Sequence, residues 1–275
     1  MTKKVKNVAA SVHARLLQKA KAEGRSFNEL LPYYGMERFL YRLAHTRHAE
    51  RFVLKGALAL EALRGHSTRA TKDIDLLGRT SASVAELVSV VRECIAAEVD
   101  EDGIRFDPRS VAGEPIRLQA RYGGVRLTFR AALGNARLAL QIDVGFGDIV
   151  TPGPIELTYP TLLGTKSPRL LGYPLETMLA EKLHAMVVLD MANTRMKDFL
   201  DLWTIAMHHE LSGKLVAQAV AATFERRATP TRSPPIALTE AFYKSPVKQA
   251  QWVAYLRKAH VSSAPTELEE VMRKL

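Results

Sequence analysis

Apolar positions near the start of the chain follow a helical spacing. Within residues 11–22 they recur every three to four residues, which predicts an amphipathic helix. Ser26 with Glu29 three residues later has the pattern of a capping box and predicts the start of a short helix. A further helix is predicted over residues 36–47, where Phe39, Leu40 and Leu43 share one face.

Between residues 51 and 147 the pattern changes to short apolar runs separated by glycine and polar residues. It predicts strands at 52–54, 73–77, 117–122, 125–131 and 137–146, and helices at 57–63 and 81–99. Gly123-Gly124 and Gly134-Asn135 are typical of hairpin turns between the last three strands. Residues 152–174 are mixed, and beyond them we expect helices only, at 175–190, 198–208 and 212–226, with two more towards the C-terminus.

The predicted fold class is therefore α+β. We expect an N-terminal helical segment at residues 1–50 that packs on the core, a mixed-sheet core at 51–173 and a helical C-terminal lobe at 174–275. With 275 residues, of which 47% are hydrophobic, the chain is long enough to bury one sizeable core or two modest ones.

The charge balance favours a polyanionic partner. A formal net charge of +10 and a pI of about 9.7 create a positive field that attracts nucleic acid or nucleotides. The alternative is a basic surface without such a partner.

The cysteine count and the hydropathy exclude several classes of protein. The lone Cys94 excludes an intramolecular disulfide and a cysteine-based metal cluster, and its apolar surroundings predict a buried thiol. The N-terminus lacks the apolar stretch of a signal peptide, and no segment approaches the roughly 20 apolar residues that cross a bilayer. We expect a soluble, cytoplasmic protein without a membrane partner.

The candidate chemistry begins with Asp73 and Asp75. They alternate around Ile74 at the start of a predicted strand, so both carboxylates point to the same face. Like charges this close favour a divalent cation such as Mg²⁺ between them. The alternative is an acidic pair that lies at a surface strand end by chance.

Gly56 and Asp143 add to this pattern. Gly56 opens a predicted helix, where free backbone N–H groups bind phosphate. Asp143 lies inside an apolar strand, where an isolated charge costs several kcal/mol unless it is paired or bound to metal. An ion pair with an arginine is the alternative for Asp143.

Lys182 and Asp198 lie in predicted helices. Spacing alone favours a solvated face for Glu181 and Lys182, and a charge that offsets the helix dipole for Asp198.

Several segments closely resemble the AbiEii family, the nucleotidyltransferase toxins of type IV toxin–antitoxin and abortive-infection systems, which belong to the DNA polymerase β-like superfamily. The similarity covers most of positions 10–210. The segments that carry it are residues 37–43, 51–60, 71–77, 142–148, 176–185 and 195–202.

The resemblance implies a role for each matching residue. Asp73, Asp75 and Asp143 match the metal-binding acids, which implies Mg²⁺, with Mn²⁺ as an alternative. Gly56 and Ala57 match the nucleotide-binding Gly-Gly or Gly-Ser, although Ala57 lacks a serine's hydroxyl. Lys182 resembles the lysine that reaches the nucleotide phosphates, and Asp198 resembles a further essential acid. The secondary phosphate contacts we consider are Arg69, Lys72 and Arg195.

The resemblance implies that the chain transfers nucleotides from an NTP to RNA, at the 3′ end of tRNA, and blocks translation. It also implies a cognate antitoxin as partner, and a monomer is our default for a two-lobed transferase. The alternatives are nucleotidylation of a protein hydroxyl and a non-catalytic module that binds nucleotide or RNA.

Overall fold

The computed structural model describes residues 7–65, 69–119, 122–230 and 235–275. The chain forms two compact units. The sheet unit comprises Met1–His66, Thr71–Gly147 and Glu156–Gly172, and the helical unit comprises Ser67–Ala70, Asp148–Ile155 and Tyr173–Leu275. None of the described helices is long and apolar enough to cross a membrane.

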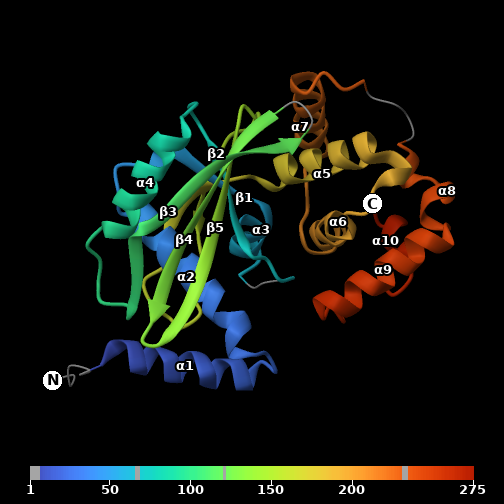
Figure 1. Ribbon diagram of the computed structural model, residues 1–275. Coiled ribbons are helices and arrows are strands. Elements are labelled where there is room, and N and C mark those ends of the chain that lie inside the picture. The colour runs from blue at the N-terminus through green and yellow to red at the C-terminus, as the bar shows by residue number, and fades with distance from the viewer. Residues whose placement is uncertain (1–6, 66–68, 120–121, 231–234) are drawn as a thin grey trace. The chain divides into compact units, whose positions relative to one another are not determined.

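The sheet unit is built around a mixed sheet, in which the described residues form seven strands in the order β3-β4-β5-β2-β1-β7-β6 (Figure 1). Strand β2 runs parallel to β5 and antiparallel to β1, so it lies in the middle of the sheet. The strands are β1 (Phe52–Lys55), β2 (Asp73–Gly78), β3 (Ile104–Gln119), β4 (Tyr122–Leu133), β5 (Ala136–Phe146), β6 (Ile155–Thr158) and β7 (Arg169–Gly172).

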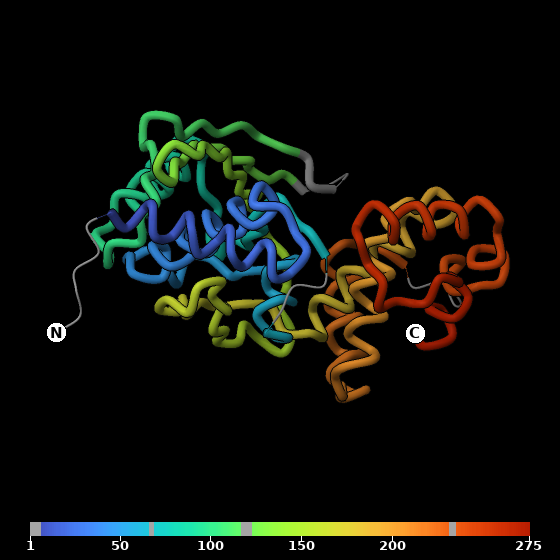
Figure 2. Tube along the Cα trace, turned by 90° about the horizontal axis from the view of Figure 1, so that it is seen from below, coloured from blue at the N-terminus to red at the C-terminus, as the bar shows by residue number. Residues whose placement is uncertain are grey.

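Helices α2 and α4 pack on one face of the sheet and bury the apolar side chains of β4 and β5. Helices α1 and α2, in blue in Figure 2, lie side by side. The helices of the unit are α1 (Val8–Ala22), α2 (Phe27–Ala44), α3 (Gly56–Arg64) and α4 (Val84–Ala96), with a 3₁₀ turn at Ala49–Arg51. Cys94 in α4 is buried as expected, and burial raises the pKa of its thiol to about 11.

The prediction of separate helices after Ser26 and at 36–47 is wrong, because α2 is one continuous helix. Ser26 does form the predicted capping box with Glu29. Pro32 lies inside the helix, where it removes one backbone hydrogen bond. Burial of nearly every residue from Leu30 to Leu43 offsets that loss.

Two sequence predictions about the long strands also fail. Strand β3 begins at Ile104, well before the predicted start at residue 117. The sequence pattern misses this first part because prolines and a register shift between Asp107 and Ala112 break the alternation of apolar and polar residues. Gly123 and Gly124 are not a turn but lie within β4, where Gly124 is paired on both sides. The turn at Gly134-Asn135 is confirmed.

The helical unit has its own core, in which Phe199 stacks on Phe242 with ring centroids 5.4 Å apart and Trp252 is fully buried. The helices predicted at 175–190, 198–208 and 212–226 are confirmed to within about two residues. Its helices are α5 (Leu175–Leu189), α6 (Met196–His208), α7 (Gly213–Arg226), α8 (Glu240–Tyr243), α9 (Pro246–Ala259) and α10 (Leu268–Met272), with 3₁₀ turns at Asp190–Ala192 and Ile236–Leu238.

Candidate active site

Three carboxylates meet in the middle of the sheet. Asp73 and Asp75 project from the same face of β2, and Asp143 projects from β5, where it is the register partner of Asp75. Each can offer an oxygen that lies within 4.8 Å of those of the other two. We call these residues the acid triad. The parallel pairing of β2 with β5 brings them together across a separation of nearly seventy residues.

Asp143 is held by two neighbours on the sheet. Arg126 of β4 donates from Nε and Nη2 to the two oxygens of Asp143, at 2.9 and 2.8 Å, and Gln141 donates from Nε2 at 3.3 Å. The hydrogen bond to Asp143 raises the pKa of Arg126. Asp143 therefore belongs to the triad and also has the arginine partner that the sequence left as an alternative.

Asp73 is oriented by Thr71, whose hydroxyl donates to Asp73 Oδ1 at 2.7 Å. The backbone N–H of Thr71 in turn donates to the hydroxyl oxygen of Tyr33 in α2, at 2.8 Å. A chain of contacts thus fixes this carboxylate from the helix that supports the sheet. Hydrogen bonds of this kind hold ligating groups in position at metal sites.

Gly56 lies directly against Asp75. Its φ of +67° is in the left-handed region, and a Cβ at this position would overlap Oδ2 of Asp75. Glycine is required here both by the backbone conformation and by the approach of the carboxylate. Gly56 and Ala57 form the first turn of α3, which has no side-chain cap. The side chain of its N-cap residue, Lys55, thus satisfies none of the first N–H groups of the helix.

The triad fits a hard divalent cation. Its donor atoms are all carboxylate oxygens, which suit Mg²⁺ or Mn²⁺, and the set contains no thiolate or imidazole that would favour zinc. Asp73 and Asp75 are only partly buried, so room remains for water or phosphate oxygens.

A second group of charges lies in the helical unit, and all of its members except Arg195 are largely buried. Lys182 of α5 donates from Nζ to Asp198 Oδ1 at 3.0 Å and to Asp201 Oδ2 at 2.6 Å. Arg69 donates to both oxygens of Asp201, from Nε at 2.8 Å and from Nη2 at 2.9 Å. Arg195 Nε lies 2.6 Å from Asp198 Oδ2. We call Arg69, Lys182, Arg195, Asp198 and Asp201 the ion-pair cluster.

Burial and charge oppose each other in the ion-pair cluster. Burial alone would raise the pKa of Asp201, but the charges of Lys182 and Arg69 outweigh it and hold that pKa below the usual range. The pKa of Asp198 is lowered in the same way by Lys182 and Arg195. Burial would lower the pKa of Lys182, but both aspartates raise it. Lys182 is therefore not part of a solvated face, and Asp198 does more than offset the dipole of α6.

The sequence-predicted residues thus fall into separate groups. Gly56, Ala57 and the acid triad lie in the sheet unit, and Lys72 is exposed next to Asp73. Arg69, Lys182, Arg195 and Asp198 lie in the helical unit.

Asp201, Thr71 and Arg126 make contacts in these two groups but were not predicted from the sequence. Asp201 could have been found, because it follows Asp198 by three residues and shares its helix face. The contacts of Thr71 and Arg126 depend on tertiary structure.

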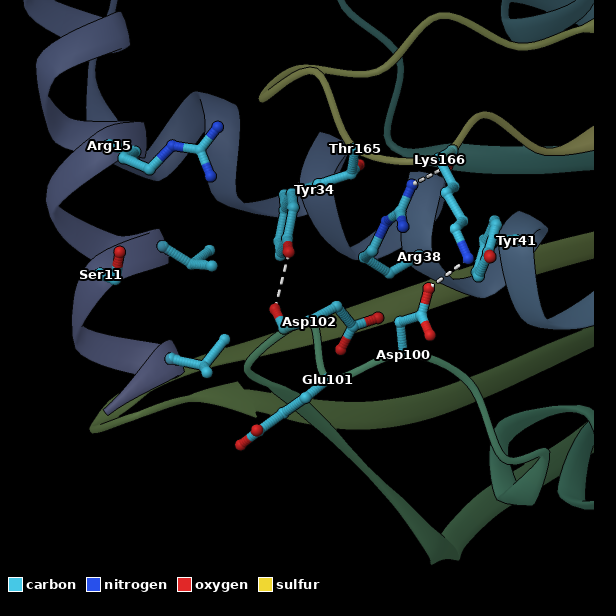
Figure 3. Close-up of a pocket in the computed structure, with 12 residues that line it drawn as sticks. Ser11, Arg15, Tyr34, Arg38, Tyr41, Asp100, Glu101, Asp102, Thr165 and Lys166 are labelled. Carbon is cyan, nitrogen blue, oxygen red and sulfur yellow. Dashed lines mark hydrogen bonds and ion pairs between the residues drawn. The ribbon is translucent and has the colours of Figure 1, made fainter. Parts of the chain in front are cut away.

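A cavity of about 470 Å³ lies elsewhere in the sheet unit, between α1, α2 and the loops at 100–102 and 165–166 (Figure 3). None of the described residues that line it belongs to the predicted site. Several of its charged side chains are paired: Lys166 with Asp100, Arg38 with Glu37, and Arg42 with Asp102. The hydroxyl of Tyr34 donates to the backbone oxygen of Asp102. Tyr34 and Arg42 thus fasten the loop at 100–102 to α2, and Lys166 joins the loop at 165–166 to it.

A mixed sheet that presents clustered carboxylates beside a glycine-led helix is the arrangement expected of a nucleotidyltransferase. Residues 38–274 match the family described as nucleotidyl transferase AbiEii toxin, type IV TA system. The chain therefore belongs to the AbiEii family, and the resemblance noted in the sequence is confirmed.

Solved structures are similar to this chain as well. JHP933 from Helicobacter pylori is 17% identical over 90% of this chain and 89% of its own, with a TM-score of 0.52, and shares the fold. The antibiotic-resistance factor ANT(2'')-Ia is 16% identical over 71% of this chain and 95% of its own, with a TM-score of 0.42. An antigenic nucleotidyltransferase-like protein from Paracoccidioides brasiliensis is 14% identical over 77% and 99%, also with a TM-score of 0.42. No curated protein sequence matches the chain. The predicted nucleotidyltransferase fold class is confirmed.

Proposed function

We propose that this protein transfers a nucleotide from an NTP to RNA, at the 3′ end of tRNA, and thereby blocks translation. The observation that carries the proposal is the acid triad next to Gly56 in a member of a nucleotidyl transferase family. A cognate antitoxin is the partner that this family implies. Both substrates are cytoplasmic molecules, so the proposal places the reaction in the cytoplasm.

In this proposal Asp73, Asp75 and Asp143 hold the metal, Mg²⁺ or Mn²⁺. The bound metal would neutralise charge on the triphosphate and steady the attacking and leaving oxygens of an in-line displacement. The acceptor hydroxyl forms a bond to the α-phosphorus, the bond to the bridging oxygen breaks, pyrophosphate leaves and the hydroxyl proton passes to solvent.

The chain's own residues position these groups. Thr71 fixes one carboxylate of the triad, and Arg126 with Gln141 fixes another. Gly56 leaves room for the carboxylate of Asp75, and in this proposal the backbone N–H groups at the start of α3 would bind phosphate oxygens.

Lys182 and Asp198 remain part of the proposal as residues required for transfer, with Lys182 acting on the nucleotide phosphates. Arg69, Lys72 and Arg195 are proposed as secondary phosphate contacts. The support for Lys182 is that buried ion pairs contribute little net stability, so a buried lysine between two aspartates suggests a role beyond folding.

The direct test supplies Mg²⁺, each α-labelled NTP in turn, and either total tRNA or cell protein. We expect label on tRNA with the wild type, and at least a hundredfold less with Asp73→Asn, since even residues that support metal ligands contribute tenfold to a hundredfold. Glu156→Gln, which changes an exposed carboxylate on β6, is the matched control and should keep wild-type activity. Label on protein would support the alternative acceptor, and equal background for wild type and Asp73→Asn would sink the proposal.

A growth assay tests Lys182 separately. Expression of the wild type should be toxic and expression of Lys182→Ala should not. Lys197→Ala, which removes an exposed lysine of α6, is the control and should remain toxic. Since Lys182 bridges two buried aspartates, Lys182→Arg is assayed as well to keep the charge. Toxicity that survives Lys182→Ala would remove Lys182 from the mechanism.

A further inference from the structure

One face of the β3–β4–β5 sheet is exposed along most of its described residues. The side chains of β4 and β5 that point towards α2 and α4 are apolar and buried. On the opposite face, alternate residues are mainly small or basic. We call this the outer face. Its exposed members are Arg105, Asp107, Ala112, Glu114, Thr128, Arg130, Arg137 and Ala139, and both of these acids lie on the edge strand β3.

The strand register connects the outer face to the acid triad. Residues that are direct register partners point to the same side of a sheet, and the same side recurs at every second residue. The row that contains Asp75 and Asp143 continues to Arg126. The next row contains Asp73, Gln141, Thr128 and Ala112.

Two further rows lead away from the triad. Ala139 pairs with Arg130, and beyond them Arg137, Ala132 and Arg105 form the last row. Six residues separate Asp143 from Arg137, so the outer face extends about 20 Å from the triad. This length matches about six nucleotides of a strand stacked at 3.4 Å each.

The arginines of the outer face are available for a ligand. Within the described part of the chain, Arg105, Arg130 and Arg137 make no ion pair with an acidic side chain, and all are exposed. Asp107 is the register partner of Arg130, but its Oδ1 accepts the backbone N–H of Arg109 at 3.0 Å. Outside the triad, Glu114 is the other exposed acid on the described part of this face, and it lies in the row of Arg126, at the edge strand. The positive charge is concentrated in the rows farther from the triad.

We infer that the outer face binds the sugar–phosphate backbone of a single-stranded RNA acceptor and leads its end to the acid triad. Arg105, Arg130 and Arg137 contact phosphates, and the small side chains Ala112, Thr128 and Ala139 leave a flat floor for the strand. The inference rests on the proposed function, because it assigns a surface to the acceptor of that reaction. Charge complementarity selects the occupant, since guanidinium groups pair with phosphates in bidentate fashion.

The test measures binding of a fluorescein-labelled single-stranded RNA by anisotropy, without NTP, at several salt concentrations. The variant combines Arg105→Gln, Arg130→Gln and Arg137→Gln, which are surface changes. We expect its dissociation constant at 0.1 M salt to rise at least tenfold. We also expect the slope of log K against log salt to become about 2 less steep, since each neutralised phosphate contributes about 0.7.

A matched control removes the same charge elsewhere in the sheet unit. Lys21→Gln, Arg47→Gln and Arg79→Gln change exposed cations outside the outer face, and their combination should bind RNA within about twofold of wild type. A second variant, Ala139→Glu, keeps every arginine but places an acid on the floor, and it should also weaken binding. Thermal melting confirms that each variant is folded.

The outcomes distinguish this inference from the proposed function. RNA binding that depends on the three arginines, in a protein that transfers no nucleotide to any acceptor, would support the surface and defeat the proposed reaction. Transfer to RNA with an unchanged KM for RNA in the triple variant would support the reaction and overturn the surface. Failure of the wild type to bind RNA, or equal losses in the variant and the charge-matched control, would also overturn it.

Discussion

The acid triad and the ion-pair cluster both gather carboxylates, but they differ in how the charges are balanced and in how far they are buried. In the triad, three carboxylates share one sheet face, and two of them are only partly buried. In the ion-pair cluster, two nearly fully buried aspartates are matched by Lys182, Arg69 and Arg195. Clustered acids repel one another, whereas each buried aspartate of the ion-pair cluster is compensated by a cationic partner.

The difference teaches which kind of effect each group should have. Neutralising Asp73 relieves repulsion within the triad, so it should affect activity far more than stability. Removing a member of the ion-pair cluster leaves a buried charge without its partner, so it should affect stability first.

The largest expected effect is that of Asp201→Asn on folding. The substitution removes the acid that pairs with Arg69 and one of the two acids that pair with Lys182, and breaking a buried pair costs about 3–5 kcal/mol. Urea unfolding followed by tryptophan fluorescence measures it, because Trp203 and Trp252, which account for both tryptophans, lie in the helical unit. Glu210→Gln, an exposed change in the same unit, should leave the midpoint unchanged.

The difference in stability between wild type and Asp201→Asn should depend on pH with a defined sign. The pKa of Asp201 is lowered in the folded state, so its stabilisation is complete above the unfolded pKa of about 3.9 and is lost as the pH falls below it. If the free energies of unfolding of wild type and Asp201→Asn differ only slightly at pH 7, the distinction between the acid triad and the ion-pair cluster is wrong.

The next effect is that of Gly56→Ala on transfer. The added Cβ would displace the carboxylate of Asp75, and a misplacement of about 1 Å costs about a hundredfold in rate. Gly24→Ala is a closely matched control, since Gly24 has a φ of +63° but nothing within 4 Å of the added atom. Both variants should lose about 1–2 kcal/mol of stability, and only Gly56→Ala should lose activity. Equal activity in the two variants would contradict the role of Gly56.

A smaller effect is expected for Thr71→Val. It removes the hydroxyl that orients Asp73 but keeps the shape of the side chain. Supporting residues of this kind contribute tenfold to a hundredfold, and we expect about a tenfold loss with a shift to higher Mg²⁺ requirement. A titration of activity against Mg²⁺ measures the shift. If the loss is the same at every Mg²⁺ concentration, Thr71 does not act through the metal.

The smallest effect is expected for His184→Gln, which tests how burial and nearby charge act on a titratable group of the helical unit. Burial first, and then the charge of Arg227, lower the pKa of His184 to about 4, whereas Asp148 opposes that shift. Because the unfolded histidine titrates near about 6.5, the wild type should lose stability as the pH falls from about 6.5 to 4.

The His184→Gln variant should lose less stability than the wild type over this pH interval. Unfolding midpoints at pH 7, 5.5 and 4.5 test this. His208→Gln, at an exposed position near the end of α6, should keep the wild-type dependence.

Much of the candidate site could be predicted from the sequence because it depends on local periodicity. The alternation of Asp73 and Asp75 predicts a shared face in any strand, and an acid inside the apolar run of β5 predicts a paired or metal-bound carboxylate. The core strands flanking the triad and the helices α5, α6 and α7 were predicted for the same reason.

Tertiary structure alone decided the rest. The strand order brings Asp143 next to Asp73 and Asp75, and the hydrogen bond between Thr71 and Tyr33 helps to orient Asp73. Arg69 meets Asp201 across more than a hundred residues, which no periodic pattern encodes. The extent of β3, the place of Gly123 and Gly124 within β4, and the continuity of α2 through Pro32 also escaped the sequence, because pairing and burial there outweigh local preference. The local sequence thus determines which side chains share a face of a helix or strand, and the tertiary structure determines which faces meet.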